Sequence, residues 1–411
     1  MKALLYLCAF VTMLLPSISQ AQDRGAINRD FQLWLEQTIW PRAQAKRVSR
    51  RTFETGIAGI SINWKLPDLV IPGAPRAPQQ SQAEFRPPAR YFDAGAVNSA
   101  TTIGRDLLRR HAAILSKIER DTGVPARILL AIWGRESSYG RAKIPYDAFE
   151  ILATKGFLGT RSDYFTNELV AALQILEGGY ATRDQMRSSW AGALGQPQFM
   201  PSSYLAYAVD GDGDGRADIW GSSADTLASI GFYLKAYGWT ANRDWGFEVT
   251  LPASASCTLE GPDNGRPIRD WQSMGVRRVS GQEFPDNARR QDGYLLLPAG
   301  RHGPAFIVTS NFYVLKDYNE SDTYALFVGH VGDKIQFGVG NFVGRWDRLD
   351  GMSRATIIRL QHALEARGFD VGGADGFIGN RTRRSVGRWQ DQNGIASTCY
   401  PDSTTIRALV R

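Results

Sequence analysis

The chain has 411 residues, of which 43% are hydrophobic and 22% are charged, as is ordinary for a soluble globular protein of two or three domains. Its formal net charge is +7, but the lysines and arginines are spread along the chain without the basic run of a nucleic-acid-binding arm. The composition therefore argues against nucleic acid as the partner and favours another polyanionic polymer.

The first 21 residues have the layout of a secretory signal peptide. Lys2 provides a basic start, residues 3–15 are apolar, and residues 19–21 form a small-x-small cleavage site. Cys8 lacks the small preceding residues of a lipid-modified cysteine, so we expect no lipid or membrane anchor. No later segment is long and apolar enough to cross a bilayer. We therefore expect an exported, soluble protein of the periplasm.

Apolar residues recur at helical spacing in the next part of the chain. Residues 27–62 predict helical structure that continues after Pro41, and residues 103–121 predict an amphipathic helix. Between them, residues 67–88 are rich in proline, glutamine and alanine, which predicts an extended strap.

Residues 125–141 predict a helix with a carboxyl group on its apolar side. Pro125 suits a first helical position, and steps of three and four residues then place on one face Ile128, Leu129, Ile132, Trp133 and Glu136. A carboxyl among apolar side chains is desolvated, which raises its pKa toward the value that a general acid needs. The alternative is a buried structural glutamate paired with an arginine.

Residues 165–177 predict another helix, followed by an unusual segment over residues 189–204. Its small residues would let the backbone approach a ligand, and Ser189 and Gln198 offer the neutral hydrogen bonds that sugars accept. A tight contact between two helices explains the same composition, so both interpretations stay open.

Residues 210–218 place aspartates at positions 210, 212, 214 and 218 with glycines between the first three, a spacing typical of a calcium-binding loop. At the twelfth position, where such a loop usually has a glutamate, the chain has Gly221. The next carboxylate is Asp225, so the loop would be longer than usual. A solvated acidic turn is the alternative, and a helix is expected over residues 225–237.

The rest of the chain predicts a β region, a further helix and a C-terminal group of three helices. Short alternating runs separated by glycine and proline predict a small β region, with strands over residues 247–251, 293–297 and 305–309. A helix is expected near residues 317–328, with Asn319 or Ser321 as its cap. The end of the chain predicts a linker and then three helices, over residues 353–367, 380–393 and 402–410.

These motifs together resemble the membrane-bound lytic murein transglycosylase B family, a group like glycoside hydrolase family 103 with a lysozyme-like core. The resemblance covers about 300 residues after the signal peptide and rests on residues 133–140, 189–204, 210–218 and 318–324. Residues 353–411 resemble the small peptidoglycan-binding domain often appended to these enzymes.

The resemblance implies a mainly α (α+β) architecture. A lysozyme-like catalytic domain would span residues 22–340, including the calcium-binding loop 210–225 and a small β region. A linker over residues 341–352 would lead to the three-helix peptidoglycan-binding domain, residues 353–411. That domain is interpreted as a tether that raises the enzyme concentration at the wall without adding chemistry.

The resemblance also implies the site residues. Glu136 occupies the position of the family's single catalytic glutamate. The implied substrate-binding positions are Ser189, Gln198, Phe199, Tyr233, Tyr318, Asn319 and Tyr324, with Tyr91, Arg161 and Tyr164. The implied metal positions are Asp210, Asp212, Asp214, Arg216 and Asp225, for a structural Ca²⁺, and no cofactor is implied for catalysis. Arg135 departs from the family pattern, and its charge would lower the pKa of Glu136.

The implied function is cleavage of the β-1,4 bond between N-acetylmuramic acid and N-acetylglucosamine, with 1,6-anhydromuramoyl ends, for cell-wall remodelling and turnover. The implied partner is the glycan strand of peptidoglycan, for a monomer with no nucleic-acid partner. Exo or endo action, the need for peptide stems and any cell-wall synthesis partner stay open. A hydrolytic muramidase and a non-catalytic wall-binding or scaffold protein are the alternatives.

Two cysteines, Cys257 and Cys399, remain after removal of the signal peptide, in a compartment that permits disulfides. They could pair and tie the catalytic region to the C-terminal domain, or both could stay free. The sequence does not say whether their Cα atoms approach closely enough.

Overall fold

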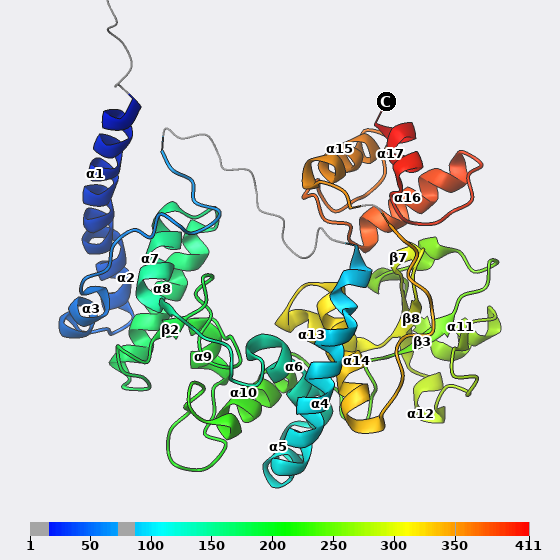
Figure 1. Cartoon of the computed structure of the whole chain (residues 1–411), viewed down its shortest axis with the longest axis horizontal. Helices are drawn as coiled ribbons and strands as arrows, with labels where there is room; N and C mark the ends of the chain where they lie inside the picture. Colours follow the sequence, from blue (N-terminus) through cyan, green and yellow to red (C-terminus); the bar gives the residue numbers. More distant parts are fainter. Residues whose placement is uncertain (1–15, 73–86, 350, 411) are drawn as a thin grey trace, which may run out of the picture. The chain divides into compact units, whose positions relative to one another are not determined.

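A computed structural model describes residues 16–72, 87–349 and 351–410, with side chains from residue 24 onward. Its contacts divide the chain into two compact units, residues 1–78 with 144–206 and residues 79–143 with 207–411 (Figure 1). The fold is mainly α with a small antiparallel sheet, as predicted. Most of the predicted signal peptide and residues 73–86 of the predicted strap lie outside the described residues.

The first unit is helical. Its helices are α1 (Pro16–Trp34), the π-helical turn η1 (Leu35–Ile39), α2 (Trp40–Ala45), α3 (Arg50–Ile57), α7 (Ala148–Leu158), α8 (Ser162–Glu177) and the start of α9 (Pro201–Tyr207). Helical structure continues past Pro41 as predicted, because proline suits the first turn of α2, where no intrahelical partner for its nitrogen is needed. The chain leaves the helix after α2, and the Ser49 hydroxyl caps α3 by accepting from the Thr52 N–H.

Helix α7 has no counterpart in the prediction. Most of its residues are buried, so no polar face marks a helical period in the sequence. It packs against α8, which confirms the predicted helix 165–177 with an earlier start. Beside α7, strand β1 (Tyr146–Asp147) pairs antiparallel with β2 (Arg187–Ser188).

The second unit is built around helix α6 (Ala126–Ser137). Residues 128–133 are 0–4% exposed, because α6 packs against its neighbours on every side rather than along one stripe. Those neighbours are helices α4 (Ala94–Arg110), α5 (Ala112–Thr122), α10 (Ser223–Ala236) and α14 (Asp322–Phe337). The 3-10 turn η3 (Pro88–Phe92) packs on α14, and helix α13 (Ser310–Tyr318) packs on α10 and α14.

The single helix predicted over residues 103–121 is wrong. The chain forms α4 and α5 instead, which meet at His111, where the backbone (φ −101°, ψ 17°) leaves the helical region. The predicted amphipathic character persists on α5, where Leu115 and Ile118 on its apolar side are 1% and 2% exposed.

The β region of the second unit is a five-stranded antiparallel sheet in the order β4-β6-β8-β3-β5. The predicted strands correspond to β3 (Gly246–Thr250), β6 (Asp292–Leu296) and β8 (Ala305–Val308). The prediction missed the shorter elements β4 (Arg266–Pro267), β5 (Arg277–Arg278), β7 (Pro298–Arg301) and the helices α11 (Ile268–Ser273) and α12 (Asp286–Arg289). Runs this short show no alternation or helical period in the sequence.

The C-terminal part of the second unit has the three predicted helices, α15 (Arg354–Glu365), α16 (Asn380–Gln392) and α17 (Ser403–Leu409). They share an apolar core of Leu360, Leu364, Val371, Val386, Trp389 and Leu409. Helix α16 packs on the 3-10 turn η4 (Cys257–Leu259) of the β region.

Cys257 and Cys399 form a disulfide bond at this contact, with both side chains fully buried. A Cβ atom on Gly387 of α16 would collide with the Cys399 sulfur, so only glycine allows this approach. The predicted linker also lies against the sheet, since the N–H groups of Val343 and Gly344 donate to the Glu248 carboxylate at 3.1 and 2.7 Å.

Among the described residues, no helix combines the length and the apolar character needed to span a membrane.

Candidate active site

Glu136 lies in the last turn of α6 and is half-buried. After Ser137 the chain turns sharply, with positive φ angles at Ser138 and Tyr139. The Tyr139 ring folds back onto Gly134, where a Cβ atom would lie only 2.6 Å from the ring. The buried helix and this turn therefore hold the Glu136 backbone rigidly.

The Glu136 carboxyl has the electrostatic environment of an acid. Burial raises its pKa to about 7, and this effect outweighs a hydrogen bond from Tyr324 and the charge of Arg135, which both lower it. The Tyr324 hydroxyl donates to Glu136 Oε1 at 2.5 Å, and Tyr324 is 2% exposed. A helix C-terminus, with its partial negative charge, also disfavours an ionised carboxylate. Near neutral pH, protonated and ionised Glu136 thus coexist.

Arg135 is held away from a direct ion pair with the neighbouring glutamate. Its guanidinium donates to the Tyr91 hydroxyl at 2.7 Å and lies 4.4 Å from the centre of the Tyr91 ring and 5.2 Å from that of Phe327. Its effect on the pKa of Glu136 is consequently smaller than that of burial. The structure thus gives Tyr91 a contact with Arg135, and its role toward a glycan stays a prediction.

The turn between α13 and α14, residues 318–324, carries three of the predicted site residues. The rings of Tyr318 and Tyr324 are nearly parallel, at 8°, with centroids 6.4 Å apart. The Asn319 side chain accepts from the Ser321 N–H at 3.2 Å, and the Ser321 hydroxyl caps α14 by accepting from the Tyr324 N–H at 3.4 Å. This turn places Tyr318 next to Tyr324 and leaves Asn319 exposed to solvent.

Tyr233 on α10 continues the row of tyrosines. Its hydroxyl donates to the Asp317 carbonyl at 2.8 Å, and its ring meets the edge of Tyr318 at 4.9 Å. On its other side it stacks with Tyr237 at 4.5 Å and contacts Tyr207 at 5.0 Å. The prediction missed these last two, although a tyrosine four residues after Tyr233 on a helix lies on the same face. Aromatic rings of this kind offer sugar rings an apolar surface.

The other predicted substrate-binding residues belong to the first unit. The Ser189 hydroxyl accepts from two backbone N–H groups of its own turn, and Gln198, with φ 55°, donates through Nε2 to the Gly195 carbonyl at 2.8 Å. Phe199 is 2% exposed. Residues 189–199 thus form a compact loop held by its own side chains.

Arg161 and Tyr164 lie together at the start of α8, also in the first unit. The guanidinium carbon of Arg161 is 4.1 Å from the centre of the Tyr164 ring. The role of every predicted residue of this unit toward a glycan stays a prediction.

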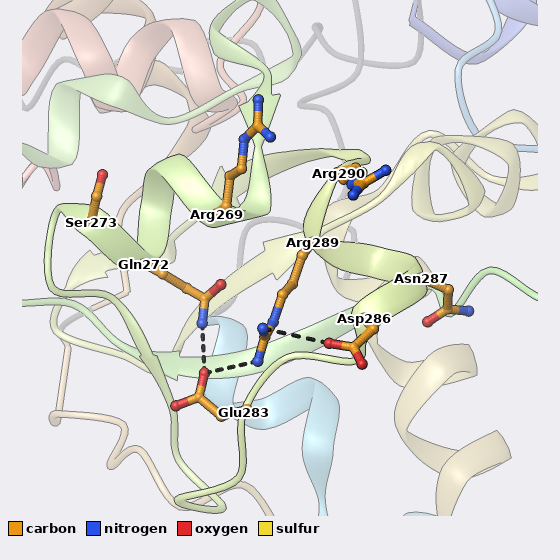
Figure 2. A pocket seen from close by; sticks show the side chains of 8 residues that line it. All are labelled: Arg269, Gln272, Ser273, Glu283, Asp286, Asn287, Arg289 and Arg290. Carbon is orange, nitrogen blue, oxygen red and sulfur yellow. Dashed lines mark hydrogen bonds and ion pairs between the residues drawn. The ribbon is translucent and has the colours of Figure 1, made fainter.

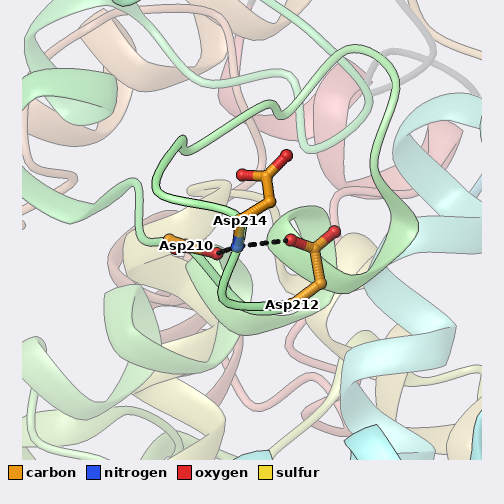
Figure 3. A group of neighbouring side chains, drawn as sticks. All are labelled: Asp210, Asp212 and Asp214. Atoms are coloured by element: carbon orange, nitrogen blue, oxygen red, sulfur yellow. Dashed lines mark hydrogen bonds between the residues drawn. The ribbon is translucent and has the colours of Figure 1, made fainter.

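The aspartate loop brings its first three carboxylates together (Figure 3). One oxygen from each of Asp210, Asp212 and Asp214 lies within 4.8 Å of the others. Asp210 accepts from the N–H groups of residues 213, 214 and 215, and these bonds, led by that of Gly215, lower its pKa. Three ionised oxygen donors at this spacing fit a hard divalent cation.

Asp225 is a buried acceptor for backbone N–H groups of the aspartate loop. It is 1% exposed, and its carboxylate accepts from the N–H groups of Gly211 and Asp218 at 2.8 and 2.7 Å. Burial raises its pKa. A ligand role for Asp225 and for the Arg216 carbonyl stays a prediction, whereas Asp225 clearly holds the loop backbone.

A polar pocket lies elsewhere in the second unit, on α11 and α12 and the segment between them (Figure 2). Arg289 pairs there with Glu283 and Asp286, both at 3.4 Å, and Gln272 donates to Glu283 at 2.8 Å. The lining contains no predicted site residue, and its charges largely neutralise one another. Glu136 is therefore the better candidate centre.

Comparisons with known protein families give matches to two parts of the chain. The profile of a family described as Transglycosylase SLT domain matches residues 30–333, and that of a peptidoglycan binding domain family matches residues 353–409. The chain is 32% identical over 214 residues to membrane-bound lytic murein transglycosylase B of Escherichia coli (strain K12). This match covers 52% of the chain and 57% of the relative, so the chain spans little more than half of that protein's length.

Among solved structures, the chain is similar to SltB3 from Pseudomonas aeruginosa in complex with NAG-anhNAM-pentapeptide. The identity is 36% and the TM-score 0.81, over 93% of this chain and 99% of that chain. A structure of SltB3 in complex with NAG-NAM-pentapeptide gives 37% and 0.82, over 92% and 99%. The Escherichia coli lytic transglycosylase SLT35 in complex with calcium gives 27% and 0.52, over 63% and 80%.

Proposed function

The chain belongs to the transglycosylase SLT domain family, and from this premise we propose that it is a lytic transglycosylase of peptidoglycan, with Glu136 as its catalytic acid and base. It cleaves the β-1,4 bond between N-acetylmuramic acid and N-acetylglucosamine and leaves a 1,6-anhydromuramoyl end. The observation that carries the assignment is the Glu136 carboxyl, which has a pKa of about 7 and accepts the Tyr324 hydroxyl at 2.5 Å.

One carboxyl group suffices for this reaction. Protonated Glu136 gives its proton to the bridging oxygen as the bond to C1 of the muramic acid breaks. The carbonyl oxygen of the sugar's N-acetyl group stabilises the positive charge at C1. The C6 oxygen then bonds to C1 while ionised Glu136 takes the C6 hydroxyl proton, so the acid is regenerated and no water is consumed. A pKa near 7 serves both halves of this cycle.

The tyrosines around Glu136 have supporting roles in this proposal. Tyr324 fixes the direction of the carboxyl, while Tyr318, Asn319 and Tyr233 hold the sugar residues, because correct placement alone lowers a barrier considerably. Ser189, Gln198, Phe199, Tyr91, Arg161 and Tyr164 are proposed as further substrate-binding residues, on the family resemblance.

The substrate also suggests where the protein works. SltB3 was solved in complex with NAG-anhNAM-pentapeptide and with NAG-NAM-pentapeptide, and residues 353–409 match a peptidoglycan binding domain, so peptidoglycan strands are the proposed partner. A wall substrate, the predicted signal peptide and a buried disulfide all favour a periplasmic protein. A monomeric enzyme is proposed, since one chain supplies the whole Glu136 environment described above.

The test is mass analysis of the fragments that the purified protein releases from isolated sacculi. The proposal predicts muropeptides that end in 1,6-anhydromuramic acid. Products heavier by one water would identify a hydrolytic muramidase, and sacculus binding without any release would identify a wall-binding protein.

The pH dependence of cleavage should follow the ionisation of Glu136. Because the first step needs the protonated carboxyl, kcat/KM should fall above about pH 7, approaching a tenfold loss per pH unit. Replacement of Tyr324 by phenylalanine removes a hydrogen bond that lowers this pKa, so the alkaline limb should move to higher pH. Rates on a soluble muropeptide from pH 5 to 9 test this expectation, and an alkaline limb near pH 4.5 in the wild-type enzyme contradicts it.

A structural Ca²⁺ is proposed for the aspartate loop, because three convergent carboxylates without a cation would repel one another. Asp210, Asp212 and Asp214 would hold the ion, with Asp225 and the Arg216 carbonyl as further predicted ligands. An ion that binds only the folded chain stabilises it, by about 2.7 kcal/mol at a hundredfold excess over the Kd.

Thermal unfolding with Ca²⁺ or with a chelator measures this effect. The wild-type Tm should rise with Ca²⁺, the Asp212→Ala variant should not respond, and Asp184→Ala, which removes an exposed carboxylate elsewhere, should respond like wild type. A chelator-insensitive wild-type Tm would make the loop a solvated turn.

A further inference from the structure

A cluster of four charged side chains joins the C-terminal helices to the helices that carry the active-site tyrosines. Arg383 on α16 donates to both carboxylate oxygens of Glu260, at 2.6 to 3.1 Å, and to Asp322 at 2.9 Å. Lys316 donates to the other oxygen of Asp322 at 2.7 Å. One guanidinium thus bridges the β region, helix α14 and the C-terminal domain.

The cluster is buried, so its geometry is constrained. The side chains of Arg383 and Glu260 are 3% and 0% exposed, and that of Asp322 is 15% exposed. Buried charges are tolerated only when their hydrogen bonds are made, and Glu260 also accepts from the Leu297 N–H while Arg383 also donates to the Ile378 carbonyl. Loss of Arg383 would leave the Glu260 carboxylate buried without an ionic partner.

Asp322 connects this cluster to the active site. It is the first residue of α14, two positions before Tyr324, whose hydroxyl donates to Glu136. Lys316 lies in the last turn of α13, two positions before Tyr318. The Lys316–Asp322 ion pair therefore joins the end of α13 to the start of α14, across the turn 318–324.

The charge of Asp322 is stable over the working pH range. Burial would raise its pKa, but Lys316 and Arg383 together lower it to about 2. Asp322 therefore stays ionised wherever Glu136 is active.

Two other links hold the same domain without contacting the turn. Arg384, the next residue on α16, pairs with Asp263 at 3.0 Å, and the Cys257–Cys399 disulfide joins the domain to η4. The domain is therefore docked by several contacts rather than attached through a linker alone, and Arg383 is distinguished by its contact with α14.

We propose that Arg383 of the C-terminal domain is a positioning residue of the active site, which acts through Asp322 to hold Tyr324 against Glu136. The inference rests on the proposed function, because it assigns a role in that reaction. It also revises the tether interpretation of residues 353–411, since part of that domain would complete the catalytic site.

The experiment measures kcat on a soluble muropeptide that needs no wall attachment, for Arg383→Gln, Asp322→Asn and the control Arg384→Gln. The first two should lower kcat by about ten- to a hundredfold, as expected for a misplaced catalytic group. The control should keep kcat within about twofold, because a partly exposed ion pair contributes little. Asp322→Asn leaves the Arg383–Glu260 pair intact, so it remains informative if Arg383→Gln does not fold.

A double-mutant cycle separates positioning from general destabilisation. If Arg383 and Asp322 act through Tyr324, then Asp322→Asn should have little further effect on kcat in a Tyr324→Phe background. The inference would be overturned if the effects of Asp322→Asn and Tyr324→Phe on kcat were fully additive. Wild-type kcat in a folded Asp322→Asn variant would overturn it as well. A wild-type enzyme that releases no anhydromuropeptide would instead reject the proposed function.

Discussion

Replacement of Glu136 by glutamine is expected to lower cleavage by roughly a hundred- to ten-thousandfold, the usual contribution of general acid–base catalysis. Glutamine keeps the volume and can still accept the Tyr324 hydroxyl, but it has no proton to give to the bridging oxygen. Glycan binding should persist, because the tyrosine row is unchanged. Release of anhydromuropeptides from sacculi and equilibrium binding to a soluble glycan measure the two effects separately.

The fold should tolerate this substitution. Burial raises the pKa of Glu136 to about 7, above that of an unfolded chain, so the folded state binds this proton more tightly and loses stability as the pH rises through 7. Glutamine carries no charge, so at pH 8 the variant should melt at or above the wild-type Tm. Glu119→Gln, which changes an exposed glutamate before the start of α6, is the matched control and should retain activity.

A Glu136→Gln variant with near wild-type activity would contradict the assignment. The acids that follow Glu136 most closely in the sequence are poor substitutes. Asp147 is paired with Arg183 and caps α7, and Glu150 accepts from the Asn63 amide. Both have structural partners, which leaves Asp163 as an exposed carboxylate without a comparable environment.

Loss of the Cys257–Cys399 bond is expected to have the largest effect on stability. The bond closes a loop with a sequence separation of 142 residues, and in the chain-entropy model a loop of this length stabilises the fold by about 5 kcal/mol. Because both sulfurs are fully buried, the double variant Cys257→Ala/Cys399→Ala is preferable to serine, which would bury two hydroxyl groups. The variant should unfold at a clearly lower denaturant concentration than the oxidised wild type.

The reduced wild-type protein is the matched control, since it keeps both sulfur atoms and lacks only the covalent bond. Its unfolding midpoint should resemble that of the double variant. Equal midpoints for oxidised and reduced wild type would show that the bond adds no stability. Free thiols in the unreduced protein, detected by mass spectrometry, would show that it does not form.

Several features could be predicted because their signals lie within one short segment. Pro125 and the three- and four-residue spacing to Glu136 predicted α6 and its acid, and alternation predicted β3, β6 and β8. The aspartate spacing predicted a turn whose carboxylates converge. Prediction failed where the local signal was absent, as in α7, which is buried on most sides, and in strands of two residues.

The tertiary structure alone decided how these segments act on one another. Glu136 and Tyr324 are 188 residues apart, and no local pattern relates them. The sequence placed Arg135 beside Glu136 but could not say that Tyr91 and Phe327 hold its guanidinium, or that burial would dominate the pKa. The cysteine pairing and the contact of Arg383 with Asp322 depend likewise on which helices pack together. Periodicity and spacing report the local backbone, whereas pKa values, disulfides and buried ion pairs depend on atoms brought together from distant segments.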